Sequence, residues 1–520
     1  MANREPLVHI DARTAADARR RGMDPRELEQ ATVAVLHYVY TSLPDTPVSA
    51  AAHLSALPDP DPDPFADDRI SDLPFALLRN IVSRLPVTDA ARTAVLARRW
   101  RPVWRCSPLA FADAHLLPGV LEGLRTPTRG GTPDLVAAVS RVLAAHPGPF
   151  RAVHLVCGYM DAHQRQLARW VQTLADKGAQ ELVLVNRPWP LDVPLPAALL
   201  GISTLTRLYL GVWRFPDTSA LQRRSGAAPA FPQLREIVLC CVVMEHRDMD
   251  FLLAGSPVLE TLGIQGSKSR LRLRLAGQHL RCVQVCTSYV ESIAVVDAPR
   301  LERLFVFAAW TDKGSCIRVK IGNAPKLRLL GYLQPGVHML EIRDNVINAG
   351  IRASPSTMAP NVKILGLTVR FGVRNDAKML PIFLRCFPNV ETLYIVSEKT
   401  EEVTGKLNLK FWQEAGPIEC IRSRIKALTF REFRGERSES SFLKFCFQSA
   451  QVLKNAVIVA SNGTFTSVLE VISKVKALNP GNWGSNCNVV VYESKDPEGG
   501  GLWNFRSGLD FSISDPFVYH

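Results

Sequence analysis

The sequence predicts an α/β protein in which a small helical module near the N-terminus precedes a solenoid of parallel strands with helical or irregular returns. Two observations carry this prediction: a dense helical spacing of apolar residues confined to about 40 positions, and an apolar triplet that recurs along most of the remaining chain. Prolines that precede many of the triplets support it, because proline marks the turns that lead into strands.

Bulk composition restricts the class of protein. The chain has 520 residues, of which 47% are apolar, so it can bury the cores of two or three folded units. We find no apolar run of the roughly 18 residues that a membrane helix needs, and no apolar secretory segment at the N-terminus. The 11 cysteines form no CxxC pair; Cys282 and Cys286 come nearest to a metal pair but lack a second pair. We therefore expect reduced thiols, no metal, no membrane, and a cytoplasmic or nuclear protein.

Residues 1–66 are predicted to be a disordered or weakly helical extension with a proline-rich linker. From Pro58 to Pro64 proline alternates with aspartate, which removes every second backbone donor and favours an extended chain. Glu27–Leu43 can form one helix, with Leu28, Val35 and Val39 among its apolar positions.

A helical module is predicted between residues 67 and 112. Pro74 suits a first helical turn, Pro86 interrupts the pattern, and Thr88 or Asp89 can cap the next helix. Apolar residues at spacings of three and four lie on shared helix faces. They are Ile70, Leu73, Leu77, Leu78, Ile81, Leu85, Ala90, Ala91, Val95, Leu96, Trp100, Val103 and Trp104.

After an amphipathic helix predicted over 161–177, the chain repeats an apolar residue followed by two more, three and five positions later. The clear starts at 205, 234, 259, 280, 301 and 327 are 29, 25, 21, 21 and 26 residues apart, in the range of leucine-rich repeats. One strand and one return element per repeat would stack into a continuous core, and 248–253 suits a returning helix. The copies are Leu205/Leu208/Leu210, Leu234/Ile237/Leu239, Leu259/Leu262/Ile264, Leu280/Val283/Val285, Leu301/Leu304/Val306, Leu327/Leu330/Tyr332, Val362/Leu365/Leu367 and Val390/Leu393/Ile395, with fainter ones at Phe150, Ala179 and Ile425.

The helical module resembles a plant F-box, because its Leu73-Pro74 start, its Leu85-Pro86 break and its Arg99-Trp100-Arg101 end occur in the order and at the spacing of that family. With the repeats and a segment that begins near Phe387, the chain is similar to plant F-box, leucine-rich repeat and FBD-domain proteins. The resemblance implies an F-box over 67–112, leucine-rich repeats over 113–384, an FBD domain over 385–465 that continues the repeats, and a C-terminal tail over 466–520.

This resemblance implies a substrate-recognition subunit of a cullin-RING (SCF-type) ubiquitin ligase, in which the F-box docks on a Skp-type adaptor and, through it, on cullin and RING subunits. Where the family often has an acidic pair after Leu-Pro, this chain has Phe75-Ala76, which forfeits about 0.3–1 kcal/mol of helix-dipole stabilisation. Eight arginines against three aspartates give the F-box a local net charge of +5, which suits an acidic adaptor or simply a solvated module. Family positions in the adaptor contact correspond here to Leu73, Pro74, Leu77, Ile81, Leu85, Pro86, Val95, Leu96 and Trp100.

The repeats would bind the target protein. Offsets three and five of each strand are buried, so offsets two, four and six face the open side of the sheet, where partners of such proteins bind. The alternative is that Phe305 and Phe307 are core and the strand is shifted by one residue, which exchanges the two faces. The expected target contacts are Arg207, Tyr209, Gln284, Phe305, Phe307 and Tyr394, with Glu236 and Gln265 on the same side.

Other functions have weaker support in the sequence. A strand over 268–275 would carry Lys268, Arg270, Arg272 and Arg274 on one face, either for an acidic target or as an ordinary solvated face. The net charge of +13 raises nucleic acid as a partner, but the basic residues are spread along the chain without a single surface of interleaved aromatics. No nucleophile elbow, P-loop, HExxH or Rossmann glycine pattern occurs, so we expect neither enzyme activity nor a cofactor. A repeat-based protein-binding scaffold outside a ligase is the remaining alternative.

Overall fold

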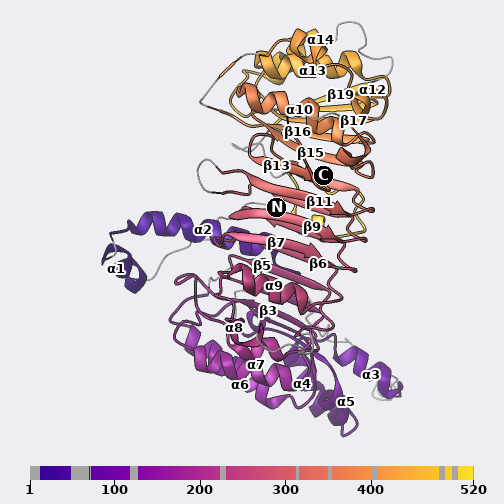
Figure 1. The fold of residues 1–520 in the computed structure, drawn as a ribbon. Coiled ribbons are helices and arrows are strands. Elements are labelled where there is room, and N and C mark those ends of the chain that lie inside the picture. The colour runs from indigo at the N-terminus through magenta and orange to yellow at the C-terminus, as the bar shows by residue number, and fades with distance from the viewer. Residues whose placement is uncertain are drawn as a thin grey trace, which may run out of the picture. The chain divides into compact units, whose positions relative to one another are not determined.

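A computed structural model of the chain describes residues 12–20, 22–48, 70, 72–117, 127–222, 230–311, 315–348, 354–400, 404–405, 407–478, 487–494 and 502–518 (Figure 1). The proline-rich linker lies outside these residues. The chain divides into two compact units, Met1–Leu259 with Gly263–Ser269, and Glu260–Leu262 with Arg270–His520.

The first unit begins with helices. After α1 (Ala12–Arg20), helix α2 (Pro25–Ser42) starts at Asp24, whose carboxylate accepts a hydrogen bond from the Arg26 amide. The helix expected over Glu27–Leu43 is therefore observed, and it buries one side that includes Leu28, Val35 and Val39. Three short helices follow in the predicted F-box, with Pro74 and Pro86 at the N-caps of the first two. These are α3 (Phe75–Val82), α4 (Val87–Leu96) and α5 (Trp100–Cys106).

Parallel strands then alternate with helices in the first unit. Strands β1 to β5 pair in chain order, and core leucines stand in register, as Leu182 does with Leu208. The helices predicted over 161–177 and around 248–253 are present as α7 and α9. The elements are β1 (Leu109–Ala112), η1 (Asp113–Leu116), α6 (Thr132–Ala145), β2 (Phe150–Leu155), α7 (Gln164–Asp176), β3 (Glu181–Val185), η2 (Ala197–Gly201), β4 (Arg207–Gly211), α8 (Ser219–Gln222), β5 (Glu236–Cys240), α9 (His246–Ala254) and β6 (Thr261–Gln265), within which the division between the units falls.

The second unit continues the same pattern. Its main sheet pairs parallel strands in the order β8, β10, β12, β15, β16, β17, β18 and β19. The strands are β8 (Cys282–Cys286), β10 (Arg303–Phe307), β12 (Leu329–Leu333), β15 (Ile364–Val369), β16 (Thr392–Ser397), β17 (Ala427–Phe433), β18 (Asn455–Ala460) and β19 (Asn488–Glu493). The helical elements are η3 (Pro355–Thr357), α10 (Arg374–Cys386), α11 (Leu409–Glu414), α12 (Glu419–Ser423), α13 (Arg437–Ser449), α14 (Val468–Leu478) and α15 (Phe505–Leu509).

A second sheet replaces the expected helical or irregular returns in the first repeats of this unit. It consists of β7 (Leu271–Ala276), β9 (Val290–Asp297), β11 (Ile317–Asn323), β13 (His338–Ile342) and β14 (Asn345–Val346). Its strands are the return elements themselves, because short repeats with alternating apolar residues close more compactly as strands than as helices. The alternation predicted over 268–275 is confirmed in β7, where Leu271, Leu273 and Leu275 are buried and Arg272 and Arg274 are exposed.

The predicted repeat register is correct in β10 but not in β12. Leu304 and Val306 of β10 are fully buried, as offsets three and five require. In β12 the pairing with β15 shifts between Leu330 and Leu333, so Leu333, not Tyr332, stands beside Leu367. Tyr332 was predicted as a core position of its repeat; that prediction is wrong, because the irregular register turns its ring to the opposite side, where it contacts Trp503 and Phe517.

No helix in the described part of the chain is long and apolar enough to cross a membrane.

Candidate functional site

The predicted F-box has its own core and, separately, an exposed apolar surface. On α3, Leu78 and Val82 are fully buried, whereas Leu77 and Ile81 are 51% and 39% exposed. Positions four residues apart lie on one side of a helix, so α3 presents one apolar side inward and another to solvent. Further exposed apolar side chains in this module are Ile70, Phe75, Val95 and Leu96. This many exposed apolar side chains on a module of three short helices indicate a protein-binding role.

The predicted adaptor contacts do not all lie on this surface. Leu77, Ile81, Val95 and Leu96 are exposed, as is Pro74, whereas Leu73, Leu85 and Pro86 are half-buried. Trp100 is only 6% exposed and belongs to the core of the module. Phe75 and Ile70 are exposed without having been predicted as contacts. We call Leu77, Ile81, Val95, Leu96 and Phe75 the F-box surface.

In the first unit, helix α2 covers the open side of β4. The Tyr209 hydroxyl donates a hydrogen bond to the Val39 carbonyl at 3.0 Å and lies 2.9 Å from the Ser42 hydroxyl. The Tyr209 side chain is 1% exposed, and burial raises its pKa, so the phenol stays protonated and keeps this donor role. A second anchor is Trp189, whose indole donates to the Thr32 hydroxyl at 2.8 Å. The prediction that Tyr209 is exposed on an open sheet is wrong, because an N-terminal helix that follows no repeat pattern occupies that side.

Arg207, the neighbour of Tyr209 at the start of β4, remains accessible. Its side chain is 42% exposed, and it pairs with Glu181 at 3.2 Å and Glu236 at 3.1 Å on the adjacent strands. Because the two carboxylates stand on the strands on either side, Arg207 joins three parallel strands.

In the second unit, residues 502–518 cover the open side of the main sheet. Four predicted target contacts, Gln284, Phe305, Phe307 and Tyr394, do share one side of the sheet, together with Tyr332 and Arg303. We call these six residues the aromatic face. The strand register was therefore predicted correctly, but the expected exposure was not. Gln284 and Phe305 are fully buried, Tyr394 is 4% exposed, and Phe307 is half-buried.

Aromatic rings carry much of this contact. The Trp503 ring stacks on Phe305, with centroids 5.4 Å apart, and on Tyr332 at 5.8 Å. Phe517 packs against Tyr332 at 4.8 Å and Tyr394 at 5.2 Å. Such stacked and edge-on pairs contribute about 0.5–1.5 kcal/mol each beyond the area that they bury.

Polar groups fix the path of the same segment. Arg303 donates to the carbonyls of Gly508, Asp510 and Ile513. Gln284 donates to the Phe505 carbonyl at 3.0 Å and accepts a hydrogen bond from the Trp503 indole at 3.2 Å. Tyr394 donates to the Asp515 carboxylate at 2.9 Å, and burial, aided by that carboxylate, raises the pKa of Tyr394. Arg303, Tyr332 and the 502–518 segment were not predicted to belong to this site; the aromatic residues of 502–517 were the one available signal.

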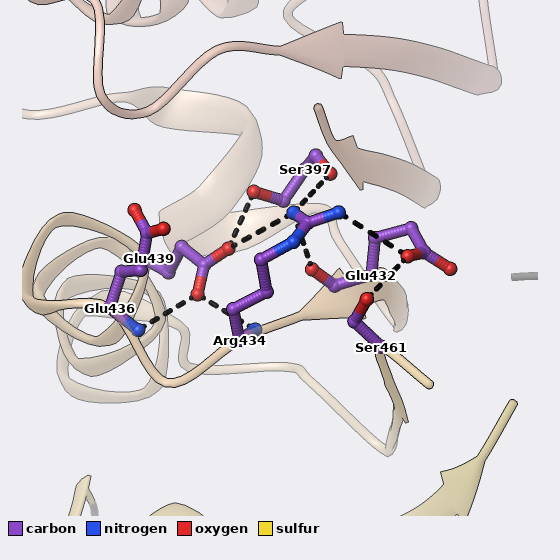
Figure 2. A network of polar contacts seen from close by, with 6 residues as sticks. All are labelled: Ser397, Glu432, Arg434, Glu436, Glu439 and Ser461. Carbon is purple, nitrogen blue, oxygen red and sulfur yellow. Dashed lines mark hydrogen bonds and ion pairs between the residues drawn. The ribbon is translucent and has the colours of Figure 1, made fainter. Parts of the chain in front are cut away.

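The FBD part contains a buried polar network that joins successive repeats (Figure 2). Arg434 donates to the carbonyls of Ser397 and Glu432, and its guanidinium lies 3.3 Å from the Glu432 carboxylate. Glu439, fully buried at the start of α13, accepts hydrogen bonds from the Ser397 hydroxyl and from the Arg434 amide. Burial raises the pKa of Glu439. Ser397 of β16 is hydrogen-bonded to Glu439 and Arg434, which follow β17, so the network stabilises the packing of successive repeats.

Among the described residues, no group of three or more His, Cys, Asp or Glu side chains could hold a metal ion. Cys282 and Cys286 are buried in β8, and the Cys282 thiol contacts the Gly508 carbonyl at 3.5 Å. Arg272, on the exposed side of β7, pairs with Glu291.

Comparisons with known proteins agree with this architecture. Residues 70–111 match the family model of the F-box domain, residues 167–395 match the model described as "FBD-associated F-box protein At5g56370, LRR repeats", and residues 413–458 match the FBD model. The chain is therefore an F-box protein with leucine-rich repeats. As the resemblance predicted, it combines an F-box, leucine-rich repeats and an FBD region.

Relatives in Arabidopsis thaliana share this composition. F-box/FBD/LRR-repeat protein At1g13570 is 23% identical over 76% of this chain and 91% of its own length. F-box/FBD/LRR-repeat protein At1g78750 is 22% identical over 82% of this chain and 96% of its own length. F-box/LRR-repeat protein At3g59200 is 32% identical, but over 38% of this chain and 36% of its own length.

Proposed function

We propose that this chain is the substrate-recognition subunit of an SCF-type ubiquitin ligase. The F-box surface docks on a Skp-type adaptor and, through it, on cullin and RING subunits, while the repeats hold the target protein. The chain itself performs no chemistry in this proposal. It contributes proximity, since a tethered target has an effective concentration on the order of 1 mM beside the conjugating enzyme.

The observation that carries the proposal is the F-box surface. Leu77 and Ile81 are apolar and exposed next to a core formed by Leu78 and Val82, so their exposure is not required for folding of the module. An apolar anchor that enters a partner's pocket is the usual centre of a protein interface. The predicted contacts at Leu73, Pro74, Leu85, Pro86, Val95 and Leu96 remain part of the proposal, with Trp100 supporting the surface from beneath.

Substitution of the anchors tests the proposal. Leu77→Arg with Ile81→Arg should weaken binding to a recombinant Skp-type adaptor by at least 100-fold in calorimetric titration, because two charges would be buried without partners. Leu469 of α14 is 73% exposed, so Leu469→Arg introduces the same side chain beyond the FBD part, far from the F-box in the sequence, and should change neither adaptor affinity nor stability.

Unchanged adaptor affinity in the double variant contradicts the docking assignment. If the wild-type chain fails to bind any Skp-type adaptor, the ligase proposal falls, and a protein-binding scaffold outside a ligase takes its place.

A further inference from the structure

We propose that residues 502–518 are a built-in ligand of the aromatic face, and that the target is recognised there through a segment of the same chemistry that displaces them. This inference rests on the proposed function for the identity of the displacing partner. The pairing between the segment and the face has its own evidence.

The segment is a second layer over the sheet and not part of the repeat core. Leu304 and Val306 are fully buried on one side of β10, whereas Phe305 projects to the opposite side, where the segment lies. Removal of the segment would therefore leave the packing around Leu304 in place. It would uncover polar groups that water can satisfy, namely the guanidinium of Arg303, the amide of Gln284 and the hydroxyl of Tyr394. It would also uncover the rings of Phe305, Phe307 and Tyr332, which a displacing segment would cover again.

The contacts are of the kind that a receptor makes with a peptide. Arg303 and Gln284 bind main-chain carbonyls of α15 and of the residue that follows it, which a segment with other side chains can offer if it folds into the same short helix. The rings of Phe305, Tyr332 and Tyr394 select aromatic side chains, because only flat rings can stack in this arrangement. Main-chain contacts of this type provide affinity, and side-chain pockets provide specificity.

The segment also shows which side chains the face accepts. Trp503 and Phe517 fill the aromatic contacts, and Asp515 places a carboxylate two positions before the last ring, against Tyr394. Phe511 lies over the Arg281 guanidinium at 3.8 Å. At Gly508, a Cβ atom would approach the Gln284 side chain to 2.6 Å, which would break the contacts that Gln284 makes with the segment. A target segment should thus carry spaced aromatic residues, a small residue between them and an acidic residue near the last one.

A trans-binding assay tests the inference on the full-length chain. The probe is a fluorescein-labelled peptide with the sequence of residues 502–518, and the released variant is Trp503→Ala with Phe517→Ala, which alters the segment and leaves the face intact. We expect the released variant to bind the probe with a Kd on the order of 10 μM. The wild type should bind about 100-fold more weakly, because its own segment competes at an effective concentration on the order of 1 mM.

Two matched controls assign the binding to this contact. Arg303→Ala added to the released variant should weaken probe binding by at least 10-fold, since it removes three carbonyl contacts. In the probe, Gly508→Val should cost at least 10-fold, whereas Ser514→Val, at a position that is exposed in the structure, should change affinity less than 2-fold.

Two results would overturn the inference. One is a released variant whose repeats unfold as cooperatively as those of the wild type but which binds no probe at 500 μM, on the order of 50 times the expected Kd. The other is a released variant that loses the cooperative unfolding of the repeats, because the segment would then be an integral part of the core. Adaptor affinity of the same variants should not change. If probe binding behaves as expected but no adaptor binds, the ligase proposal alone fails, and the segment remains a built-in ligand.

Discussion

The two sides of β10 provide a direct comparison between core and ligand contacts. Leu304 is fully buried between Val283 of β8 and Leu330 of β12, its register partners. Leu304→Ala removes a buried side chain from a site with strands on both sides, where such substitutions cost about 3–5 kcal/mol. For a unit of this size, 1 kcal/mol lowers Tm by about 2–4 °C, so we expect a fall of roughly 6–20 °C.

Phe305 is larger and equally buried, yet its removal should cost less. If the 502–518 segment is bound at an effective concentration of 100 times its Kd, its docking stabilises the unit by about 2.7 kcal/mol, which is the upper limit for the effect of Phe305→Ala through the segment. In the released variant the ring is already uncovered, so the same substitution should cost less than about 1 kcal/mol. Leu304→Ala should keep its full cost in both backgrounds.

Each substitution is compared in two backgrounds, the wild type and the released variant, by urea unfolding followed by circular dichroism. The difference between its cost in the two backgrounds is its coupling energy with the 502–518 segment. The reasoning is refuted if Phe305→Ala costs as much in the released variant as in the wild type, or if it exceeds Leu304→Ala. Either result would mean that Phe305 packs in the repeat core.

Two further predictions concern buried polar groups. Burial lowers the pKa of His338 to about 4, whereas in the unfolded chain the imidazole takes up a proton near pH 6.5. The free energy of unfolding therefore falls as the pH is lowered from 6.5 towards 4, by about 2 kcal/mol at pH 5.0. His338→Asn keeps an acceptor for the Gln334 amide and cannot become charged, so its urea midpoint should depend less on pH between 7.5 and 5.0; an identical dependence would contradict this assignment. Tyr209→Phe removes the hydrogen bond to the Val39 carbonyl, so it should lower the free energy of unfolding by about 0.5–1.5 kcal/mol and accelerate amide hydrogen exchange in α2. Unchanged exchange in α2 would show that the hydroxyl does not hold the helix.

The sequence identified the elements whose burial follows a local period. Leucines at offsets three and five identified the core side of the strands, as at Leu304, and spacings of three and four identified the F-box helices. Trp100 shows the limit of this reasoning, because the resemblance does not distinguish a residue that touches the adaptor from one that supports those that do.

What covers the second side of each sheet was not predictable in the same way. Gln284 and Phe505 are separated by 221 residues, and Tyr209 and Val39 by 170, so neither contact leaves a local pattern. A period of two shows that Phe305 and Leu304 lie on opposite sides, but not whether solvent or another segment meets Phe305. The irregular register at Tyr332 likewise arises from pairing between β12 and β15, which the spacing of apolar residues alone does not contain.

Affinity purification of the full-length chain from plant cells after proteasome inhibition, with mass spectrometry of the bound proteins, tests the central claim most directly. The wild type should recover a Skp-type adaptor, a cullin and one or more target proteins. The Leu77→Arg/Ile81→Arg variant should lose adaptor and cullin together while retaining the targets, because the F-box surface and the repeats are separate contacts. Equal recovery of adaptor and cullin with both proteins would contradict the account.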